Sequence, residues 1–445
     1  MSDSKVLTRR EFVKTTGNAV AAASLLSMNH STTPAWTGRR RYAIVGTGDR
    51  ASSMWGRSLV EPYSEVLEFV GLCDINPKRA AVAKEIIGVN CPTFTGFDEM
   101  LDKTKPDLLM VTTVDAFHSE YIVKALDRGI DVMTEKPMVI NETQCQAVLD
   151  AEKRNKKKIV VTFNYRYAPK HQKIKEILLG GEIGRVISVD FSWYLDVYHG
   201  ADYFRRWHRL RSKSGSLWVH KASHHFDLIN WWLSADPVEV MAEANLQVYG
   251  KKGPFRFTNC RPCQHKSQCA FYYDMTKNAT RMKLYAGCED VDNYHRDGCV
   301  FREDVDIFDT MSALVKYSNG ATMTYSLNAF MPFEGYRLAF NGEKGRLEIR
   351  DYERQPWNLE NTEETEIYLT KSFGERQQIK ITKADGGHGG GDSRLKDLIF
   401  RKIDAPEYMR LPDSRAGAMS CLTGIAARNS VDQKRPVKIA DLVKL

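Results

Sequence analysis

Short apolar runs alternate with amphipathic stretches across residues 41–155, and this alternation constrains the fold more than any other feature of the chain. The apolar runs, counted with their terminal residues, lie at 41–51, 66–80, 106–114 and 130–138. Amphipathic stretches such as 118–129 and 142–155 separate them. Buried strands that alternate with helices of this length predict a parallel sheet with crossover helices. We therefore expect a doubly wound α/β domain over residues 38–160.

The pattern changes after residue 160. Longer candidate strands follow at residues 184–198, 238–250, 312–330, 336–352 and 365–370. The turn sequences SNGA and NGEKG are typical of hairpins, and residues 416–431 have the pattern of a helix that packs back onto the body. We expect residues 161–445 to form an α+β domain around a large, open, mostly antiparallel sheet.

The first 37 residues have the features of an export leader. Arg9 and Arg10, in the order Thr-Arg-Arg-x-Phe-Val-Lys, precede an apolar stretch at residues 15–28, and this order resembles a twin-arginine signal. The stretch is shorter than the roughly 20 residues that span a bilayer. We expect export to the periplasm without a stable membrane anchor; a disordered basic leader is the alternative.

Charge excludes one class of partner. The 445 residues carry a formal net charge of +8, and the basic residues are scattered. Nucleic-acid binding favours a basic face with interleaved aromatic residues, so we expect no nucleic-acid partner.

A glycine fingerprint follows the first predicted strand. Gly46, Gly48 and Ala51 form G-x-G-x-x-A between a strand and a helix, where the glycines allow a tight turn and close approach of a pyrophosphate. Asp74 ends the next predicted strand, where a carboxylate accepts hydrogen bonds from ribose hydroxyls and repels a 2′-phosphate. The pattern favours NAD over NADP, although Arg79 nearby leaves room for NADP.

Glu135-Lys136-Pro137 ends another predicted parallel strand, at the sheet edge where doubly wound folds bind ligands. A lysine beside a nicotinium ring has its ammonium form disfavoured, which lowers its pKa toward that of a useful base. The alternative is a surface lysine in a turn.

Six segments together resemble the glucose–fructose oxidoreductase, inositol dehydrogenase and MocA family. They are residues 111–138, 163–169, 181–191, 223–232, 317–330 and 342–349. The resemblance implies a Rossmann domain followed by a domain whose open sheet is often used in oligomer contacts. It also implies a nicotinamide cofactor and a small carbohydrate substrate, and we expect a homo-oligomer.

With the fingerprint, the resemblance gives a set of expected cofactor-binding residues: Gly46, Gly48, Arg50, Ala51, Asp74, Thr113, His118, Glu135, Lys136 and Asn164.

The stretch SGSLWVHKASHHFDLINWW (214–232) concentrates histidines on a predicted helix. His220 and His224 are one turn apart and would point the same way, so a zinc pair and satisfied polar packing are alternatives to a catalytic group. In the family, Asp-x-x-x-His is usual here and acts with the lysine of Glu-Lys-Pro as the acid/base group. His224 matches the family histidine, whereas His220 replaces the aspartate. We expect Lys136, His220 and His224 to be catalytic, without a metal.

Neighbouring polar and aromatic residues suit a sugar ring, although a packed amphipathic helix accounts for 202–209 nearly as well. The expected substrate-binding residues are Lys136, Arg166, Tyr203, Arg206, Trp207, His220, Lys221, His224 and His388.

Five of the nine cysteines fall in one region, at positions 260, 263, 269, 288 and 299. Thiolates that converge from a short loop bind zinc or an iron–sulfur cluster, and export also permits disulfides. We expect a structural role, by disulfides or by zinc, ahead of a redox cluster.

The sequence therefore predicts an NAD-binding oxidoreductase that oxidises a secondary hydroxyl of a sugar or glycoside. One alternative is an exported glycosidase that keeps NAD tightly bound and works by transient oxidation, elimination, hydration and reduction. Another is a non-catalytic sugar-sensing module that kept the fold.

Overall fold

The structure is a computed structural model that describes residues 38–356, 365–381, 387 and 389–444. The expected twin-arginine motif at Arg9 and Arg10 and the expected substrate residue His388 lie outside these described residues. Contacts divide the chain after Gly38, and the description below concerns the unit that begins at Arg39. Within the described residues, no helix has both the length and the apolar character needed to cross a bilayer.

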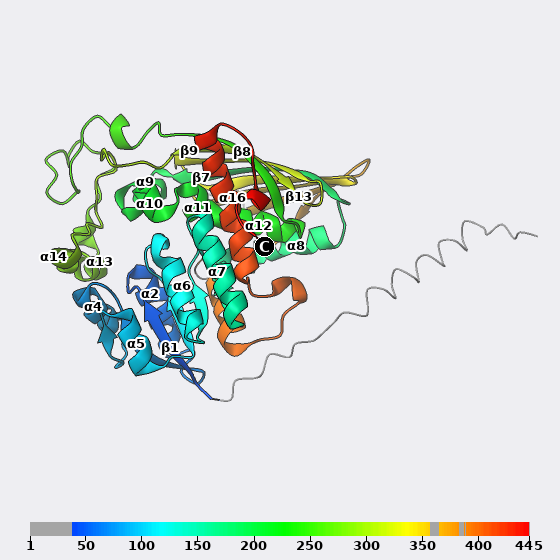
Figure 1. Cartoon of the computed structure of the whole chain (residues 1–445). Coiled ribbons are helices and arrows are strands. Elements are labelled where there is room, and N and C mark those ends of the chain that lie inside the picture. The colour runs from blue at the N-terminus through cyan, green and yellow to red at the C-terminus, as the bar shows by residue number, and fades with distance from the viewer. Residues whose placement is uncertain (1–37, 357–364, 382–386, 388, 445) are drawn as a thin grey trace, which may run out of the picture. The chain divides into compact units, whose positions relative to one another are not determined.

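The N-terminal part of this unit is a Rossmann domain (Figure 1). Its six strands are all parallel and lie in the order β3-β2-β1-β4-β5-β6. Their bounds are β1 Arg40–Val45, β2 Leu67–Cys73, β3 Thr93–Phe94, β4 Leu108–Val111, β5 Asp131–Thr134 and β6 Ile159–Val161. The alternation of apolar and amphipathic segments therefore predicted the correct fold class.

The crossover helices begin and end at local signals. The helices are α4 Pro77–Ile87, α5 Phe97–Thr104, α6 His118–Asp127 and α7 Glu142–Asn155. The side chain of Asn76 accepts the N–H of Arg79 at the start of α4, and Asn141 does the same for Gln144 at the start of α7. Such side-chain caps pair a backbone donor that has no partner inside the helix.

A nine-stranded sheet forms the core of the C-terminal part. The strand order is β14-β13-β12-β11-β7-β10-β9-β8-β15, and only the pair β7 and β10 is parallel. The bounds are β7 Val186–Asp196, β8 Pro237–Asn245, β9 Thr310–Tyr317, β10 Thr322–Met331, β11 Glu334–Gly342, β12 Gly345–Arg354, β13 Thr365–Lys371, β14 Arg376–Ile379 and β15 Val437–Lys438. The expectation of a large, mostly antiparallel sheet is confirmed.

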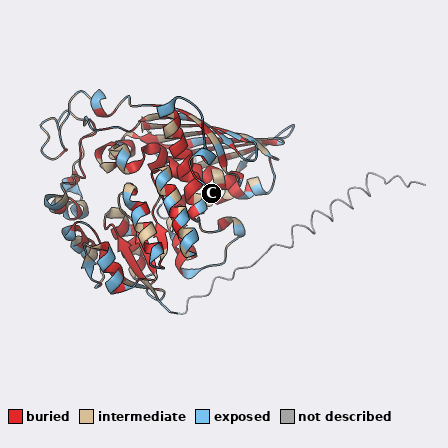
Figure 2. Ribbon diagram, in the orientation of Figure 1, coloured by how far each residue is buried: buried red, intermediate tan, exposed pale blue. Residues whose placement is uncertain are grey.

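Buried helices connect this sheet to the Rossmann domain. The long helix α16 (Ser414–Gln433) contacts β8, α12 (Ala222–Leu233) and α11 (Leu217–His220), and it also contacts α7 and β6 of the Rossmann domain. Figure 2 shows α12 and much of α16 as buried. Because α11 and α12 carry the histidine stretch, this packing fixes where those histidines lie.

A long, mostly irregular insertion joins β8 to β9. We call residues 246–309 the strap; it contains the short helices α13 (Ala279–Leu284) and α14 (Glu289–Asp292). The buried carboxylate of Asp309 accepts three consecutive backbone N–H groups at the start of the strap, those of Gln247, Val248 and Tyr249. At its far end the strap lies against α4 of the Rossmann domain (Figure 1).

Candidate active site

The glycine loop between β1 and α2 (Asp49–Ser52) lies against the loop that follows β4. Gly46 has φ +83°, and a Cβ there would lie 2.7 Å from the backbone of Thr113. The hydroxyl of Thr112 donates to the carbonyl of Gly46 over 2.6 Å. Only glycine combines this backbone conformation with such a close approach. The loop therefore has the shape that admits a pyrophosphate at the start of the helix.

Asp74 follows β2, as expected, and faces the glycine loop. Its Oδ2 accepts the backbone N–H of Thr47 over 2.8 Å. Arg79 forms ion pairs with both Asp74, at 3.5 Å, and Asp292 of the strap, at 2.7 Å. A guanidinium already paired with two carboxylates is poorly suited to bind a 2′-phosphate, so the contacts support NAD over NADP.

Lys136 follows β5 and points at α11. Its Nζ donates to the carbonyl of His220 over 2.9 Å and lies 3.4 Å from Nε2 of the same residue. Burial lowers the pKa of Lys136 to about 8. An amine that is partly neutral near pH 8 can accept a proton, which a surface lysine cannot do efficiently at that pH.

Glu135 orders the residues beside Lys136. Its Oε1 accepts from Nε of Arg50 over 2.6 Å and from the indole N–H of Trp55 over 2.7 Å. Burial opposes ionisation of Glu135, but Arg50 and these hydrogen bonds keep its pKa below the usual value. The carboxylate is therefore charged and holds Arg50 at the glycine loop.

His220 has a carboxylate partner that the sequence did not indicate. Its Nδ1 lies 2.5 Å from Oδ2 of Asp115, in the loop after β4. Burial raises the pKa of Asp115 and lowers the pKa of His220, and a contact this short holds one proton between the two groups. When that proton is on Nδ1, the lone pair of Nε2 faces Lys136. The charge expected at position 220 from the family pattern is thus supplied from another strand end.

Aromatic rings surround His220. The ring of His208 lies 4.1 Å from it in an edge-on arrangement, Tyr203 at 5.4 Å and Trp207 at 5.7 Å. Burial, with the charge of Arg206, lowers the pKa of His208 well below its usual value. His208 is therefore neutral, and sequence reasoning passed over it although Tyr203, Arg206 and Trp207, shortly before it in the chain, were expected.

His224 lies in α12, one turn beyond His220, but the two side chains have different surroundings. The ring of His224 stacks on Tyr165 at 4.6 Å. The structure corrects the expected continuous helix, because α11 ends at His220 and α12 begins at Ala222. His220 contacts Lys136 and Asp115, whereas His224 contacts Tyr165.

Two other expected substrate residues, Arg166 and Lys221, have different partners. Arg166 forms a two-pronged, buried ion pair with Asp227 and lines a separate cavity with Trp231. Lys221 is buried, with Nζ 4.7 Å from the ring centre of Trp193. Arg166 lies apart from the Lys136–His220 group, because its guanidinium is taken up by Asp227 on α12.

The remaining expected cofactor residues lie around the same loops. His118 places its ring nitrogens 2.8 Å from the carbonyl of Pro137 and 3.1 Å from that of Thr113. Asn164 donates to Asp392 over 2.5 Å. Asp392 in turn lies 3.8 Å from a guanidinium nitrogen of Arg50. These contacts connect β4, β5 and β6 at the carboxyl edge of the sheet.

A polar cavity of about 510 Å³ adjoins the glycine loop. Residues of α2, of α9 (Val197–Arg205) and of the strap line it, together with Arg206, which follows α9. It includes Asp49, Arg50, Asp202, Arg206, Arg281 and Arg296. Each of these four arginines is paired with a carboxylate, so the cavity beside the glycine loop is polar and mixed in charge.

The strap contacts the glycine loop directly. The backbone N–H of Asp49 donates to the hydroxyl of Tyr285 over 2.9 Å, and Nε of Arg281 lies 3.2 Å from the Asp49 carboxylate. A Cβ at Gly48 would lie 3.2 Å from the same hydroxyl. The strap therefore covers the end of the loop where a dinucleotide would bind.

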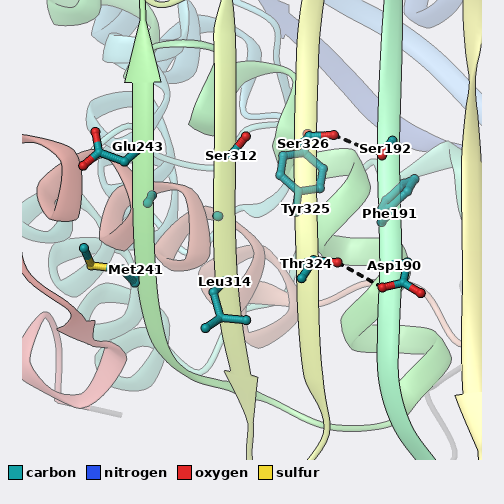
Figure 3. A pocket seen from close by; sticks show the side chains of 12 residues that line it. Asp190, Phe191, Ser192, Met241, Glu243, Ser312, Leu314, Thr324, Tyr325 and Ser326 are labelled. Atoms are coloured by element: carbon teal, nitrogen blue, oxygen red, sulfur yellow. Dashed lines mark hydrogen bonds between the residues drawn. The ribbon is translucent and has the colours of Figure 1, made fainter.

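A second cavity lies away from this group, on the sheet surface formed by β7, β8, β9 and β10. Figure 3 shows polar side chains along these strands, with Ser326 hydrogen-bonded to Ser192 and Thr324 to Asp190. The cavity is about 430 Å³, and none of the expected catalytic residues lines it. We therefore do not assign the chemistry to this surface.

The cysteines do not pair as disulfides. All nine are free thiols, which corrects the disulfide alternative. Among the described residues, the one group of three ligand atoms that converges within 4.8 Å is Glu289, His295 and Asp297, so the cysteine sulfurs do not have the spacing of a closed zinc site. Glu289 and Asp297 are both paired with Arg261.

Comparisons with known proteins identify the family to which both domains belong. The oxidoreductase family description of an NAD-binding Rossmann fold matches residues 40–163, and that of a C-terminal alpha/beta domain matches residues 175–439. YteT of Bacillus subtilis, which is named as an oxidoreductase, is 41% identical over 426 residues, covering 91% of this chain and 99% of YteT. The chain belongs to this family. It is an NAD-binding oxidoreductase of the glucose–fructose oxidoreductase, inositol dehydrogenase and MocA type.

Two further comparisons concern ligands. D-glucoside 3-dehydrogenase of Escherichia coli is 29% identical over 146 residues, which is 33% of this chain and 41% of that protein. A solved oxidoreductase from Agrobacterium radiobacter, in complex with NAD⁺, L-tartaric acid and magnesium, has a TM-score of 0.62 at 15% identity and covers 91% of this chain and 100% of its own. The structural likeness at this identity shows the fold alone.

Sequence reasoning missed Asp115 and Tyr285. Asp115 follows β4 and Lys136 follows β5, and these neighbouring parallel strands end at the same edge. That shared edge was a usable signal, because polar residues after adjacent parallel strands converge. Tyr285 gave no such signal, since it belongs to an irregular insertion.

Proposed function

We propose that this oxidoreductase oxidises a secondary hydroxyl of a sugar or glycoside, with Lys136 as the base. The main support for this proposal is the buried amine of Lys136, whose pKa is lowered to about 8. This amine contacts His220, which in turn contacts Asp115. Bound NAD supplies the hydride acceptor. Gly46, Gly48 and the start of α2 fit its pyrophosphate, and Glu135 fixes Arg50 beside them.

The proton steps belong to the chain's own residues. Neutral Lys136 accepts the hydroxyl proton of the substrate as the carbinol carbon gives up a hydride, which leaves a ketone. Nε2 of His220, 3.4 Å from Nζ, accepts a hydrogen bond from the resulting ammonium of Lys136. Asp115, at Nδ1 of the same ring, fixes the tautomer in which Nε2 is that acceptor. His224 lies one turn further along α12.

A carbohydrate substrate is supported by the side chains around His220. Trp207 and Tyr203 offer ring faces and edges to the apolar face of a sugar. Arg206, paired with Asp202 at 2.8 Å, offers donors to its hydroxyls. The resemblance to a protein named D-glucoside 3-dehydrogenase supports the same substrate class.

The test replaces the base. Lys136→Ala is expected to abolish reduction of NAD by sugars or glycosides, with NAD binding retained. Absorbance of the reduced nicotinamide measures NAD reduction, and an equilibrium binding assay measures NAD binding. Exposed Lys103→Ala is the matched control. Full activity in the Lys136 variant overturns the assignment, and a wild-type protein that gives no absorbance change with any glycoside favours the sugar-sensing alternative.

A second candidate function is net glycoside hydrolysis with NAD retained. The contact of Tyr285 and Arg281 with the glycine loop favours slow release of NAD, and a cofactor that stays bound must return to its starting state each cycle. Oxidation beside the anomeric region, elimination of the aglycone, addition of water and reduction satisfy that requirement. Lys136, His220 and His224 supply the acid/base groups.

Chromogenic glycosides distinguish the two functions. The protein is stripped of NAD and then reconstituted. If release of the chromophore requires NAD but no net NADH accumulates, the result supports hydrolysis. Accumulation of NADH in proportion to product supports the dehydrogenase, and a failure to cleave any glycoside overturns the glycosidase.

Export through the twin-arginine route to the periplasm also remains our proposal, resting on Arg9, Arg10 and the apolar stretch after them. Arg9→Lys together with Arg10→Lys is expected to leave the protein in the cytoplasmic fraction. An unchanged periplasmic fraction contradicts export by this route.

We further propose that the chain forms a homo-oligomer through the sheet surface of Figure 3. The support is the open sheet itself, the part of the fold that the family resemblance associates with oligomer contacts. Sedimentation that gives a monomer at micromolar concentration overturns this proposal.

A further inference from the structure

Lys221 is the single residue between α11 and α12, and its ammonium group is buried. The side chain is 3% exposed, and its Nζ donates a hydrogen bond to no residue within the part of the chain that the structure describes. A buried ammonium without a hydrogen-bond acceptor is costly, and native proteins contain few such groups. A ligand that brings an oxygen atom to Nζ would remove this cost.

The nearest carboxylate, that of Glu334 on β11, does not supply the missing acceptor. Its Oε1 lies 3.9 Å from Nζ of Lys221, which is beyond the length of a hydrogen bond. Both carboxylate oxygens instead accept from Nδ1 of His199, at 2.7 and 2.9 Å. Glu334 therefore balances the charge of Lys221 but leaves its N–H groups without a partner.

Aromatic rings form the other surroundings of the ammonium. Nζ of Lys221 lies 4.7 Å from the ring centre of Trp193 on β7 and 5.8 Å from that of Tyr165. The faces of these rings attract a cation, but they are weak substitutes for an oxygen acceptor. Tyr165 in turn stacks on His224, so the ammonium lies at the wall that carries the expected catalytic residues.

Lys221 is also close enough to Lys136 to act on it electrostatically. Burial lowers the pKa of Lys136 to about 8, and the positive charge of Lys221 contributes to the lowering. The residue before Lys221 is His220, which contacts Lys136 directly. A sugar held by Lys136 therefore lies within the neighbourhood of the Lys221 ammonium.

Tyr203 offers an acceptor beside this donor. Its hydroxyl lies 2.9 Å from Nε2 of His199. In the neutral imidazole, Glu334 holds the proton on Nδ1, so that Nε2 accepts the hydroxyl hydrogen of Tyr203. Burial raises the pKa of Tyr203, so the hydroxyl keeps its proton and its oxygen can only accept further bonds. A sugar hydroxyl both accepts and donates, whereas a carboxylate only accepts; the wall therefore matches hydroxyls.

We propose that Lys221 donates a hydrogen bond to a second hydroxyl of the sugar, beside the hydroxyl that Lys136 deprotonates, and so selects substrates that carry this second hydroxyl. The inference rests on the proposed function for the class of substrate. A sugar without that hydroxyl leaves the ammonium unpaired in a site from which water is excluded, and a site of this kind rejects such an analogue strongly.

The test is equilibrium binding of sugars to the full chain loaded with NAD, measured by calorimetry. The probes are methyl glucoside, methyl galactoside and methyl mannoside. Lys221→Met keeps the length of the side chain and removes its charge and donors. We expect it to weaken binding of the preferred glycoside by about 10- to 100-fold, the effect of a hydrogen bond from a charged group, with NAD affinity unchanged. Lys103→Met, at an exposed lysine of α5, is the matched control.

Equal binding by the unchanged protein and Lys221→Met overturns the proposal, and so does the absence of binding by all three glycosides.

Glycosides that each lack one hydroxyl identify what Lys221 recognises. In the unchanged protein, one deoxy form of the preferred glycoside is expected to bind more weakly than its parent. In Lys221→Met, the parent and that deoxy form are expected to bind alike, and Lys221→Gln, which retains a donor, recovers part of the difference. Discrimination that persists in Lys221→Met overturns the proposal. A loss confined to methyl glucuronide also overturns it, because Lys221 would then bind a carboxylate.

Two further measurements separate recognition from a structural role. Lys221→Met is expected to raise the urea midpoint of the sugar-free protein, because a buried charge is removed while Glu334 keeps His199. It is also expected to move the midpoint of the kcat/KM profile to higher pH, since the charge of Lys221 no longer lowers the pKa of Lys136. A lower urea midpoint with unchanged sugar binding assigns Lys221 to the fold and overturns the proposal.

Binding and turnover are measured separately, so the two proposals can fail separately. Sugar binding that depends on Lys221 without reduction of NAD contradicts the proposed oxidation and supports the role of Lys221. Reduction of NAD with sugar binding that is independent of Lys221 supports the oxidation and overturns the role of Lys221.

Discussion

Asp115 and His220 show at the residue scale how one substitution in a family pattern is compensated. The family places a carboxylate on the histidine helix itself, and this chain places one after β4, 2.5 Å from His220 Nδ1. Both arrangements put a carboxyl group beside an imidazole. The strength of this contact comes from burial, since an ion pair in water is worth far less.

Asp115→Asn is expected to lower kcat by about 100-fold, near the lower end of what general acid–base groups contribute. The amide cannot hold the proton that Asp115 shares with His220, so His220 is a poorer acceptor from Lys136. As a positioning residue, Asp115 is also expected to change the pH profile while NAD affinity stays the same. Asp150→Asn, an exposed carboxylate on α7, is the control. A loss of NAD binding together with kcat would instead indicate a structural role.

The pH dependence tests Lys136. Because a base acts in its neutral form, kcat/KM is expected to rise as pH increases through about 8, the pKa that burial gives Lys136, and then to level off. The rate is measured with saturating NAD across that range, on protein whose circular dichroism is constant. A profile that falls through the same range would contradict the role of Lys136 as the base.

At the scale of elements, α16 positions the histidine stretch through close contact with α11. A Cβ at Gly424 would lie 2.1 Å from the carbonyl oxygen of Trp218, two residues before His220. Glycine therefore allows the approach of the two helices, and the approach sets the distance from His220 to Lys136.

Gly424→Ala is expected to destabilise the fold by about 1–3 kcal/mol, the usual cost of overpacking a core, and to lower kcat as α11 moves. Urea unfolding measures the change in stability, and initial rates measure the change in kcat. Gly287→Ala is the control, because its Cβ would meet nothing closer than 3.6 Å, and it is expected to change stability by no more than about 0.5 kcal/mol. Equal stability of the two variants would show that α16 adjusts freely.

At the scale of the whole molecule, the strap connects the sheet domain to the glycine loop. It leaves the sheet at β8, contacts Asp49 through Tyr285 and Arg281, and returns at β9. We therefore expect these contacts to slow the release of a bound dinucleotide.

Tyr285→Phe is expected to accelerate NAD release several-fold, because one hydrogen bond contributes about 0.5–1.5 kcal/mol. Adding Arg281→Ala increases the effect. Transfer of bound NAD to an excess of a scavenging dehydrogenase measures the rate, and Tyr368→Phe on β13 is the control. Release that is as slow as in the unchanged protein would show that the strap does not retain the cofactor.

Local pattern was enough to predict the two sheets, the glycine loop and the position of Lys136 at a strand end. Strand and helix periodicities, and a glycine needed for a tight turn, are properties of neighbouring residues, so they are visible in sequence. Even the departure at His220 was visible as a missing charge.

The source of that charge was decided only by the tertiary structure. Asp115 and His220 are separated by 105 positions, and Asp49 and Tyr285 by 236. No periodicity connects such residues; the strand order of the Rossmann sheet, the packing of α11 against α16 and the course of an irregular strap bring them together. Burial then changed the chemistry of the site. The pKa of Lys136 and the proton shared by Asp115 and His220 depend on the exclusion of water, which the Rossmann sheet, the packed helices and the strap provide together.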